Sequence, residues 1–289
     1  MFNLYINDLA LYLKSFDTGV TCNNEKISIL MYADDLVLLA ESEHDLQILL
    51  NALNAWCNTW DMSINVTKSQ VVHFRRPSVP KTKAIFKCGD RVLDVVESYT
   101  YLGMLIDEFL DYERTAKSVA KSASRALGLL IAKCKIIGGL PFNVFTKLYD
   151  NIVVPVISYS VCIWGFKPYS CISAIQNRAM RFYLGVGKYT PNAALSGEMG
   201  WVPMCVRQYT SISNFLVRIS CTQSSRLNKR IALWAFGNAM SCKNWFYNFR
   251  QIISDLNINV HLELSNPMSE QFINTVAYLH LLTLISQND

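Results

Sequence analysis

The first hundred residues alternate short apolar runs with polar turns, a pattern that predicts strands. Runs 27–32 and 36–40 flank Ala33-Asp34-Asp35, which predicts a hairpin buried on both sides with two carboxylates at its tip. Ser42 is a predicted helix N-cap, because apolar residues recur at helical spacing from Leu46 to Trp56. Two further strand pairs and a single strand are predicted at 62–66 with 70–74, 83–87 with 91–95, and 99–106.

Beyond Asp107 the apolar period becomes that of amphipathic helices. A long helix over 111–137 is predicted to end at Gly138-Gly139, and the next runs from Pro141 to about Ile157, kinked or ended by Pro155. Later helices are predicted at 169–184, 191–200, 205–221, 226–240, 245–256 and 269–285. The fold class is therefore predicted as α+β, with a small mixed front and an all-helical back.

Charge divides the chain in the same order. Residues 1–113 carry nine Lys/Arg against sixteen Asp/Glu, a net −7, and residues 114–289 carry eighteen against six, a net +12. An acidic front followed by a basic back suggests a metal or carboxylate site and a phosphate-binding surface. The alternative is that the two segments form solvated faces of opposite charge, and charge alone favours this alternative.

Composition limits the cellular setting. Hydrophobic residues make up 51% of the chain, enough for a sizeable core, and the longest uncharged apolar run, 152–165, is too short to span a bilayer and contains Pro155. The nine cysteines are scattered without a C-x-x-C pair, which argues against zinc and favours reduced thiols. We expect a nuclear or cytoplasmic protein that is neither secreted nor membrane-spanning.

The acidic hairpin carries the sharpest chemical signal. Two carboxylates at one tip repel, and each raises the pKa of the other unless a cation or hydrogen-bond donor neutralises them. Mg²⁺, held by a few carboxylates and by substrate phosphates, is the usual solution. An ordinary Asp-Asp turn in solvent is the alternative, and spacing alone favours it.

A series of motifs changes that balance. Tyr-Ala-Asp-Asp between apolar runs resembles the catalytic hairpin of reverse transcriptases, and Phe2 to Leu9 resembles the segment before it in non-LTR retrotransposon enzymes. Ile64 to Ser69 with Phe74 resembles the lysine-bearing palm motif, and Tyr101-Leu102-Gly103 resembles the primer grip. Later segments resembling the post-palm region of animal elements are Tyr159 to Gly165, Ile175 to Arg178 and Glu198 to Pro203.

The resemblance implies a role for each matching residue. In such polymerases two Mg²⁺ ions hold the primer 3′-hydroxyl and the incoming triphosphate. Asp34 would ligate metal, and Asp35 is the weaker ligand because adjacent strand residues point to opposite faces. Lys68 would serve the leaving pyrophosphate as general acid or electrostatic partner, with a solvated turn lysine as the alternative. The residues near the primer or nucleotide would be Tyr32, Ala33, Tyr101, Leu102 and Gly103, although 101–103 also reads as a β-edge turn with Gly103 permitting a bend.

The resemblance also implies domains and a missing element. Residues 1–108 would be a partial palm, an antiparallel sheet with a packed helix; 109–187 a thumb-like helical domain; and 188–289 a helical extension. The family's first catalytic aspartate and the fingers lie upstream of the motifs found here, and neither Asp8 nor Asp17 has that strand context. We therefore expect weak Mg²⁺ binding and no polymerisation by these residues alone. A separate chain is one possible source of the other half, and RNA template and DNA primer are the implied partners.

The predicted helix 111–137 carries a basic stripe. Arg114, Lys117, Lys121 and Arg125 fall within about 80° at 100° per residue, opposite an apolar face. Such a face would follow the phosphates of a primer–template duplex, although any surface helix can be basic by chance. Two readings of the chain stay open besides an incomplete polymerase: a non-catalytic nucleic-acid-binding remnant, and an unstable decayed reading frame.

Overall fold

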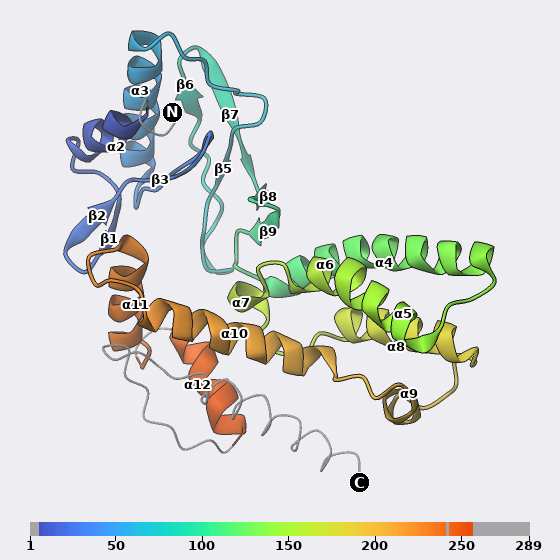
Figure 1. The fold of residues 1–289 in the computed structure, drawn as a ribbon. Coiled ribbons are helices and arrows are strands. Elements are labelled where there is room, and N and C mark those ends of the chain that lie inside the picture. The colour runs from blue at the N-terminus through green and yellow to red at the C-terminus, as the bar shows by residue number, and fades with distance from the viewer. Residues whose placement is uncertain (1–5, 241–242, 257–289) are drawn as a thin grey trace. The chain divides into compact units, whose positions relative to one another are not determined.

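The computed structural model describes residues 6–240 and 243–256. The chain forms two compact units. The front unit comprises Met1–Tyr99 with Asp107–Leu110, and the helical unit comprises Thr100–Ile106 with the chain from Asp111 onward. Figure 1 identifies their elements by label, and each unit is described by itself.

The front unit packs short strands against two helices. Its elements are α2 (Asn7–Lys14), β1 (Val20–Cys22), β2 (Glu25–Ile27), β3 (Ile29–Tyr32), β4 (Asp35–Leu38), α3 (Glu43–Thr59), β5 (Gln70–Val72), β6 (Phe86–Cys88) and β7 (Arg91–Val96). The pairs β1–β2, β3–β4 and β6–β7 are antiparallel, whereas β5 joins β7 in parallel. The predicted hairpins around Asp34 and around Gly89-Asp90 are therefore confirmed.

Helix α3 organises the front core. Ser42 is its N-cap, and the Ser42 hydroxyl accepts a hydrogen bond from the Asp45 N–H at 3.1 Å, as predicted. One side of α3 packs with α2 through Leu53 and Trp56, and Leu50 contributes to a second cluster with the β6–β7 strands. Two small clusters, rather than one continuous core, stabilise this unit.

The predicted strand pair 62–66 with 70–74 is wrong. Residues 62–65 form no strand, and β5 pairs with β7 instead. Met62 and Ile64 are partly buried against the α3 clusters. An irregular segment that packs one side on the core can show the same alternation of apolar and polar residues as a half-buried strand. The alternation at 62–66 has this cause. Helix α2 and the β1–β2 hairpin were not predicted.

The helical unit contains one hairpin and most of the helices. Its elements are β8 (Ser98–Tyr101, which begins in the front unit), β9 (Met104–Asp107), α4 (Tyr112–Ile137), α5 (Phe142–Leu148), the π-helix η1 (Tyr149–Val153), α6 (Val154–Ser158), α7 (Val161–Trp164), α8 (Ser170–Leu184), α9 (Asn192–Met199), α10 (Met204–Ser220), α11 (Leu227–Gly237) and α12 (Trp245–Asp255). The predicted helices are confirmed within a few residues. The prediction at 269–285 lies outside the described residues.

Capping explains why α4 could be predicted so closely. The Asp111 carboxylate accepts the Glu113 N–H at 3.0 Å, and Gly138 ends the helix in the left-handed conformation at φ 82°. Downstream of α5, the chain passes through η1 before α6, where Pro155 occupies the first turn. A proline is tolerated there because the first helical N–H groups have no intrahelical partner.

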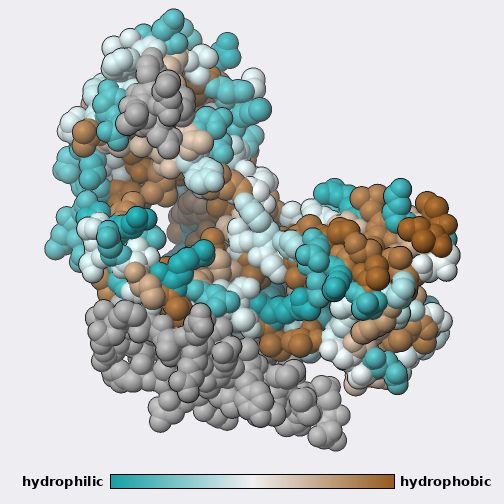
Figure 2. Space-filling view, in the orientation of Figure 1, coloured by the Kyte–Doolittle hydropathy of each residue, from teal (hydrophilic) through white to brown (hydrophobic). Residues whose placement is uncertain are grey.

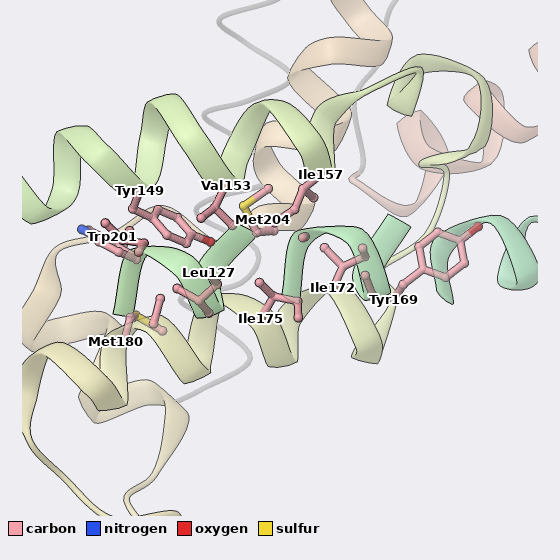
Figure 3. Close-up of a cluster of buried hydrophobic side chains, with 14 of the residues drawn as sticks. Leu127, Tyr149, Val153, Ile157, Tyr169, Ile172, Ile175, Met180, Trp201 and Met204 are labelled. Carbon is pink, nitrogen blue, oxygen red and sulfur yellow. The ribbon is translucent and has the colours of Figure 1, made fainter. Parts of the chain in front are cut away.

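One large apolar cluster holds α4, α8 and the helices between them together (Figure 3). Leu127 of α4 and Ile172 of α8 belong to this cluster, and so do Tyr149 and Trp201, whose rings stack with centroids 4.4 Å apart. A second cluster joins α10, α11 and α12. The predicted boundary at residue 188 stays a prediction; Leu195, Met199 and Trp201 share the cluster of α4.

The surface of the helical unit is not uniformly polar. In Figure 2, hydrophobic atoms gather where Figure 1 places the C-terminal part of α4 and α5. The exposed apolar residues there are Leu129, Ile136, Ile137, Phe142 and Val144. Among the described residues, no helix is both long and apolar enough to cross a bilayer. No disulfide joins the eight cysteines within the described part of the chain.

Candidate active site and nucleic-acid interface

The acidic hairpin is formed by β3 and β4. Its register pairs Tyr32 with Asp35, so Ala33 and Asp34 alone form the turn, one residue shorter than predicted. Ala33 has φ 53°, the left-handed conformation that a two-residue hairpin turn requires at its first position. The turn thereby places the two carboxylates at the hairpin end.

The two faces of this hairpin differ, because paired residues share a face and neighbours alternate. Ile29, Leu36 and Leu38 pack toward the α2–α3 cluster. Tyr32 and Asp35 lie on the opposite face, where Tyr32 is 65% exposed. The expectation of strands buried on both sides is therefore wrong, because the helices cover one face only.

Both acids at the tip are exposed to solvent. Among the described residues, no group of three or more His, Cys, Asp or Glu side chains is placed to hold a metal ion. Two adjacent carboxylates are suitable ligands for Mg²⁺, but they do not make a complete two-metal site. The residues at this tip therefore fit part of such a centre, and we derive no metal-dependent step from them.

Lys68 lies in a turn before β5 and is exposed. The Tyr99 hydroxyl donates to the Lys68 carbonyl at 3.0 Å, which fixes the backbone of this turn within the front unit. The exposed ammonium group is accessible to pyrophosphate and to solvent alike. Its role stays a prediction.

Residues 99–106 form a hairpin rather than the single strand that was predicted. Strands β8 and β9 are joined by Leu102 and Gly103, both at positive φ (46° and 77°). Two consecutive left-handed residues reverse the chain, and glycine is favoured at such positions. In the Tyr101-Leu102-Gly103 motif, Tyr101 therefore ends β8, and Leu102 and Gly103 form a tight turn; the proposed contact of the motif with a primer stays a prediction.

The basic stripe of α4 has the predicted geometry. Arg114, Lys117, Lys121 and Arg125 are all exposed, while Ala123 and Leu127 on the other side of α4 are buried. We call these four residues the basic stripe. The one carboxylate on α4, Glu113, lies 3.4 Å from the Lys167 ammonium. The stripe is therefore a continuous cationic surface on a rigid helix.

Helix α8 adds a cation next to the stripe. The Arg178 guanidinium donates to the Ser124 hydroxyl at 3.1 Å, and Arg125 donates to the Ser122 hydroxyl at 3.1 Å. Small serines between the basic residues leave the surface low enough for a phosphate backbone to approach. The sequence placed Arg178 on a helix but did not indicate that it packs beside α4.

Part of the front unit and of the β8–β9 hairpin matches a known protein family. Residues 1–106 match the model of the reverse transcriptase (RNA-dependent DNA polymerase) family. No solved structure matches the chain, so the assignment of palm and thumb has no structural neighbour behind it.

Curated relatives extend the likeness past residue 106. A probable RNA-directed DNA polymerase from transposon BS of Drosophila melanogaster is 27% identical over 183 residues, covering 60% of this chain and 20% of that protein. The RNA-directed DNA polymerase from the mobile element jockey of the same fly is 24% identical over 189 residues, covering 61% and 19%. A Pol polyprotein from the type-1 retrotransposable element R2 of Popillia japonica is 27% identical over 168 residues, covering 56% and 22%.

The matched region of the chain spans about a fifth of the length of these relatives. Matches that cover three fifths of the chain necessarily reach beyond the 1–106 segment into the helical unit. The resemblance predicted from the hairpin and its flanking motifs is therefore confirmed: residues 1–106 match the reverse transcriptase family, and the chain is similar to RNA-directed DNA polymerases of non-LTR mobile elements.

Proposed function

We propose that the chain supplies the second part of the palm and the thumb of an RNA-directed DNA polymerase that extends a DNA primer on an RNA template. The observation that carries the proposal is the basic stripe. Four exposed cations share one face of α4 and directly follow the β8–β9 turn and the segment that matches the family. Regularly spaced cations on a helix face suit the repeating phosphates of a nucleic-acid backbone.

The front unit would contribute the acid hairpin. Asp34 at the turn and Asp35 beside Tyr32 would offer carboxylate oxygens to Mg²⁺, and the exposed Lys68 would offer an ammonium group to pyrophosphate. Divalent metal would lower the charge of the transferring phosphoryl group in the assembled enzyme. Tyr32 and Ala33 would lie near the primer end.

The 289 residues on their own would bind nucleic acid without extending a primer. The hairpin tip provides two carboxylates, and a two-metal centre needs more ligands than these. The family's first catalytic aspartate, supplied by a separate chain or by sequence outside these 289 residues, would complete the centre. If extension is never restored by such a chain while duplex binding persists, the protein is the non-catalytic nucleic-acid-binding remnant, which the same exposed stripe also favours.

The test is salt-dependent binding of the full chain to an RNA–DNA duplex. Replacing Lys117 and Lys121 together by Gln removes two phosphate contacts, so the slope of log K against log salt should become shallower by about two. The matched control replaces Lys133 and Lys147, which are exposed outside the stripe, and makes the same change in net charge. The slope of this control should stay close to that of the unmodified chain.

Two outcomes would contradict the proposal. Equal losses in the two double variants would mean that net charge, not the stripe, determines binding. Robust primer extension by the isolated chain with Mg²⁺ and nucleotides, abolished by Asp34→Ala, would overturn the proposal that these residues do not polymerise alone.

A further inference from the structure

The turn between β8 and β9 belongs with the helices rather than with the strands before it. Residues Thr100–Ile106 cluster with the helical unit, although their neighbours on both sides belong to the front unit. Met104 packs against the cluster formed by α4 and α8. Something in the helical unit must therefore hold this short segment, and the contacts of Leu102 and Gly103 identify it.

Tyr159, which follows α6, makes both contacts. Its hydroxyl donates to the Leu102 carbonyl at 2.5 Å. Its ring lies against Gly103, where an added Cβ would stand only 3.1 Å from Tyr159 Cε1. At φ 77° any side chain at this position would also be strained. Gly103 thus serves both to reverse the chain and to admit the tyrosine ring.

Tyr159 is itself anchored in the core. The fully buried Trp164 donates its indole N–H to the Tyr159 carbonyl at 3.1 Å, and the Tyr169 hydroxyl donates to the Trp164 carbonyl at 2.9 Å. Burial raises the pKa of Tyr169, so its hydroxyl stays protonated as a donor. These bonds leave little freedom to the backbone that carries the Tyr159 ring.

Helix α4 supplies a second anchor for the same hairpin. The buried Thr115 hydroxyl donates to the Leu105 carbonyl at 2.8 Å. Thr115 follows Arg114, the first residue of the basic stripe, so its side chain is turned by about 100° around the helix axis and is buried where Arg114 is exposed. The hairpin and the stripe are therefore attached to different faces of one helix.

We propose that Tyr159 is a positioning residue that fixes the Leu102-Gly103 turn on the helical unit, so that one body contacts both the phosphate backbone and the primer 3′ end. The inference rests on the proposed function, because it assumes that the stripe binds a duplex. It goes further by assigning a task to a residue outside the matched 1–106 segment. Tyr159 acts through the turn and needs no contact of its own with the substrate.

The test compares two RNA–DNA duplexes in equilibrium binding to the full chain. One duplex has a recessed DNA 3′ end, and the other has both ends closed by loops. The unmodified chain should prefer the recessed end, and Tyr159→Phe should weaken that preference about fivefold, the factor for one net hydrogen bond of about 1 kcal/mol. Its affinity for the closed duplex should not change. Amide exchange at Leu102 to Met104 should accelerate in the same variant.

The control is Tyr247→Phe, which removes a hydroxyl from α12 and should alter neither affinity nor exchange. If the unmodified chain binds neither duplex, the proposed function fails, and the inference that rests on it fails with it. If the chain binds both duplexes equally, or if Tyr159→Phe weakens both equally or leaves the preference intact, the positioning role is overturned.

Discussion

The two units present their functional residues in different ways. The front unit holds its acids at the end of a hairpin that is packed on one face only, above two small apolar clusters. The helical unit holds its cations on a 26-residue helix whose other side lies in a large, continuous cluster. The proposed binding surface therefore lies on a helix held by a large core, whereas the described residues around the acid tip do not supply the further ligands of a metal centre.

Phosphate binding and metal-dependent chemistry place different demands on the structure, so we propose them for different units. A cationic helix face needs only its own packing to present charge to phosphates. A two-metal centre needs carboxylates from several elements held within a few ångströms. The first requirement is met within the helical unit, and the second is met only in part within the front unit.

The largest difference between the two units is expected from a substitution in the core of the helical unit. Trp164 is fully buried, and Trp164→Ala should cost about 3–5 kcal/mol, the usual range for removing a buried aromatic side chain. Hydrogen exchange should show lost protection across α4 and α8, while the α3 peptides keep theirs. The neighbouring Ile163, 37% exposed, provides the control Ile163→Ala with a much smaller loss. An equal loss in both units would mean that they unfold together.

A somewhat smaller effect is expected from the front unit's buried ion pair. Arg75 Nε lies 3.1 Å from Glu108 Oε2, with side-chain exposures of 13% and 4%, and the guanidinium covers the Phe109 ring at 4.6 Å. Arg75→Met leaves a buried carboxylate without its partner, which should cost about 3 kcal/mol. Protection should fall in β7 and α3 and persist in α8.

The double variant Arg75→Met with Glu108→Gln is the matched comparison for this pair. Removing both charges should restore part of the lost stability, because no unpaired charge then stays buried. A double variant that is less stable than the single one would show that the ion pair does not control the stability of this region.

The sequence predicted those elements whose ends are determined by nearby residues, such as helix caps and turns. The amphipathic period and the glycine at 138 bounded α4 to within a residue, and Ser42 located the start of α3. The acid hairpin was found from two apolar runs and a turn, although its turn is one residue shorter. In each of these cases, the residues that determine the structure lie within a few positions of one another.

The features that the sequence did not predict depend on contacts between residues far apart in the chain. The parallel pairing of β5 with β7 joins residues 24 positions apart, and Tyr159 reaches Leu102 across 57 positions. The motif at 159–165 was noticed in the resemblance, but no pattern in the chain indicated which backbone its tyrosine would hold. The roles of the acids and of Lys68, the domain boundaries and a nuclear or cytoplasmic location all stay predictions.

The central claim is that the helical unit carries the nucleic-acid surface. Photo-crosslinking of the full chain to an RNA–DNA duplex with a reactive group at the primer 3′ end and others along the phosphates, followed by peptide mapping, tests it most directly. We expect crosslinks from the phosphates to the α4 segment 114–125 and from the primer end to the 101–103 turn. Crosslinks confined to α11 and α12, or to the front unit away from the acid hairpin, would contradict it.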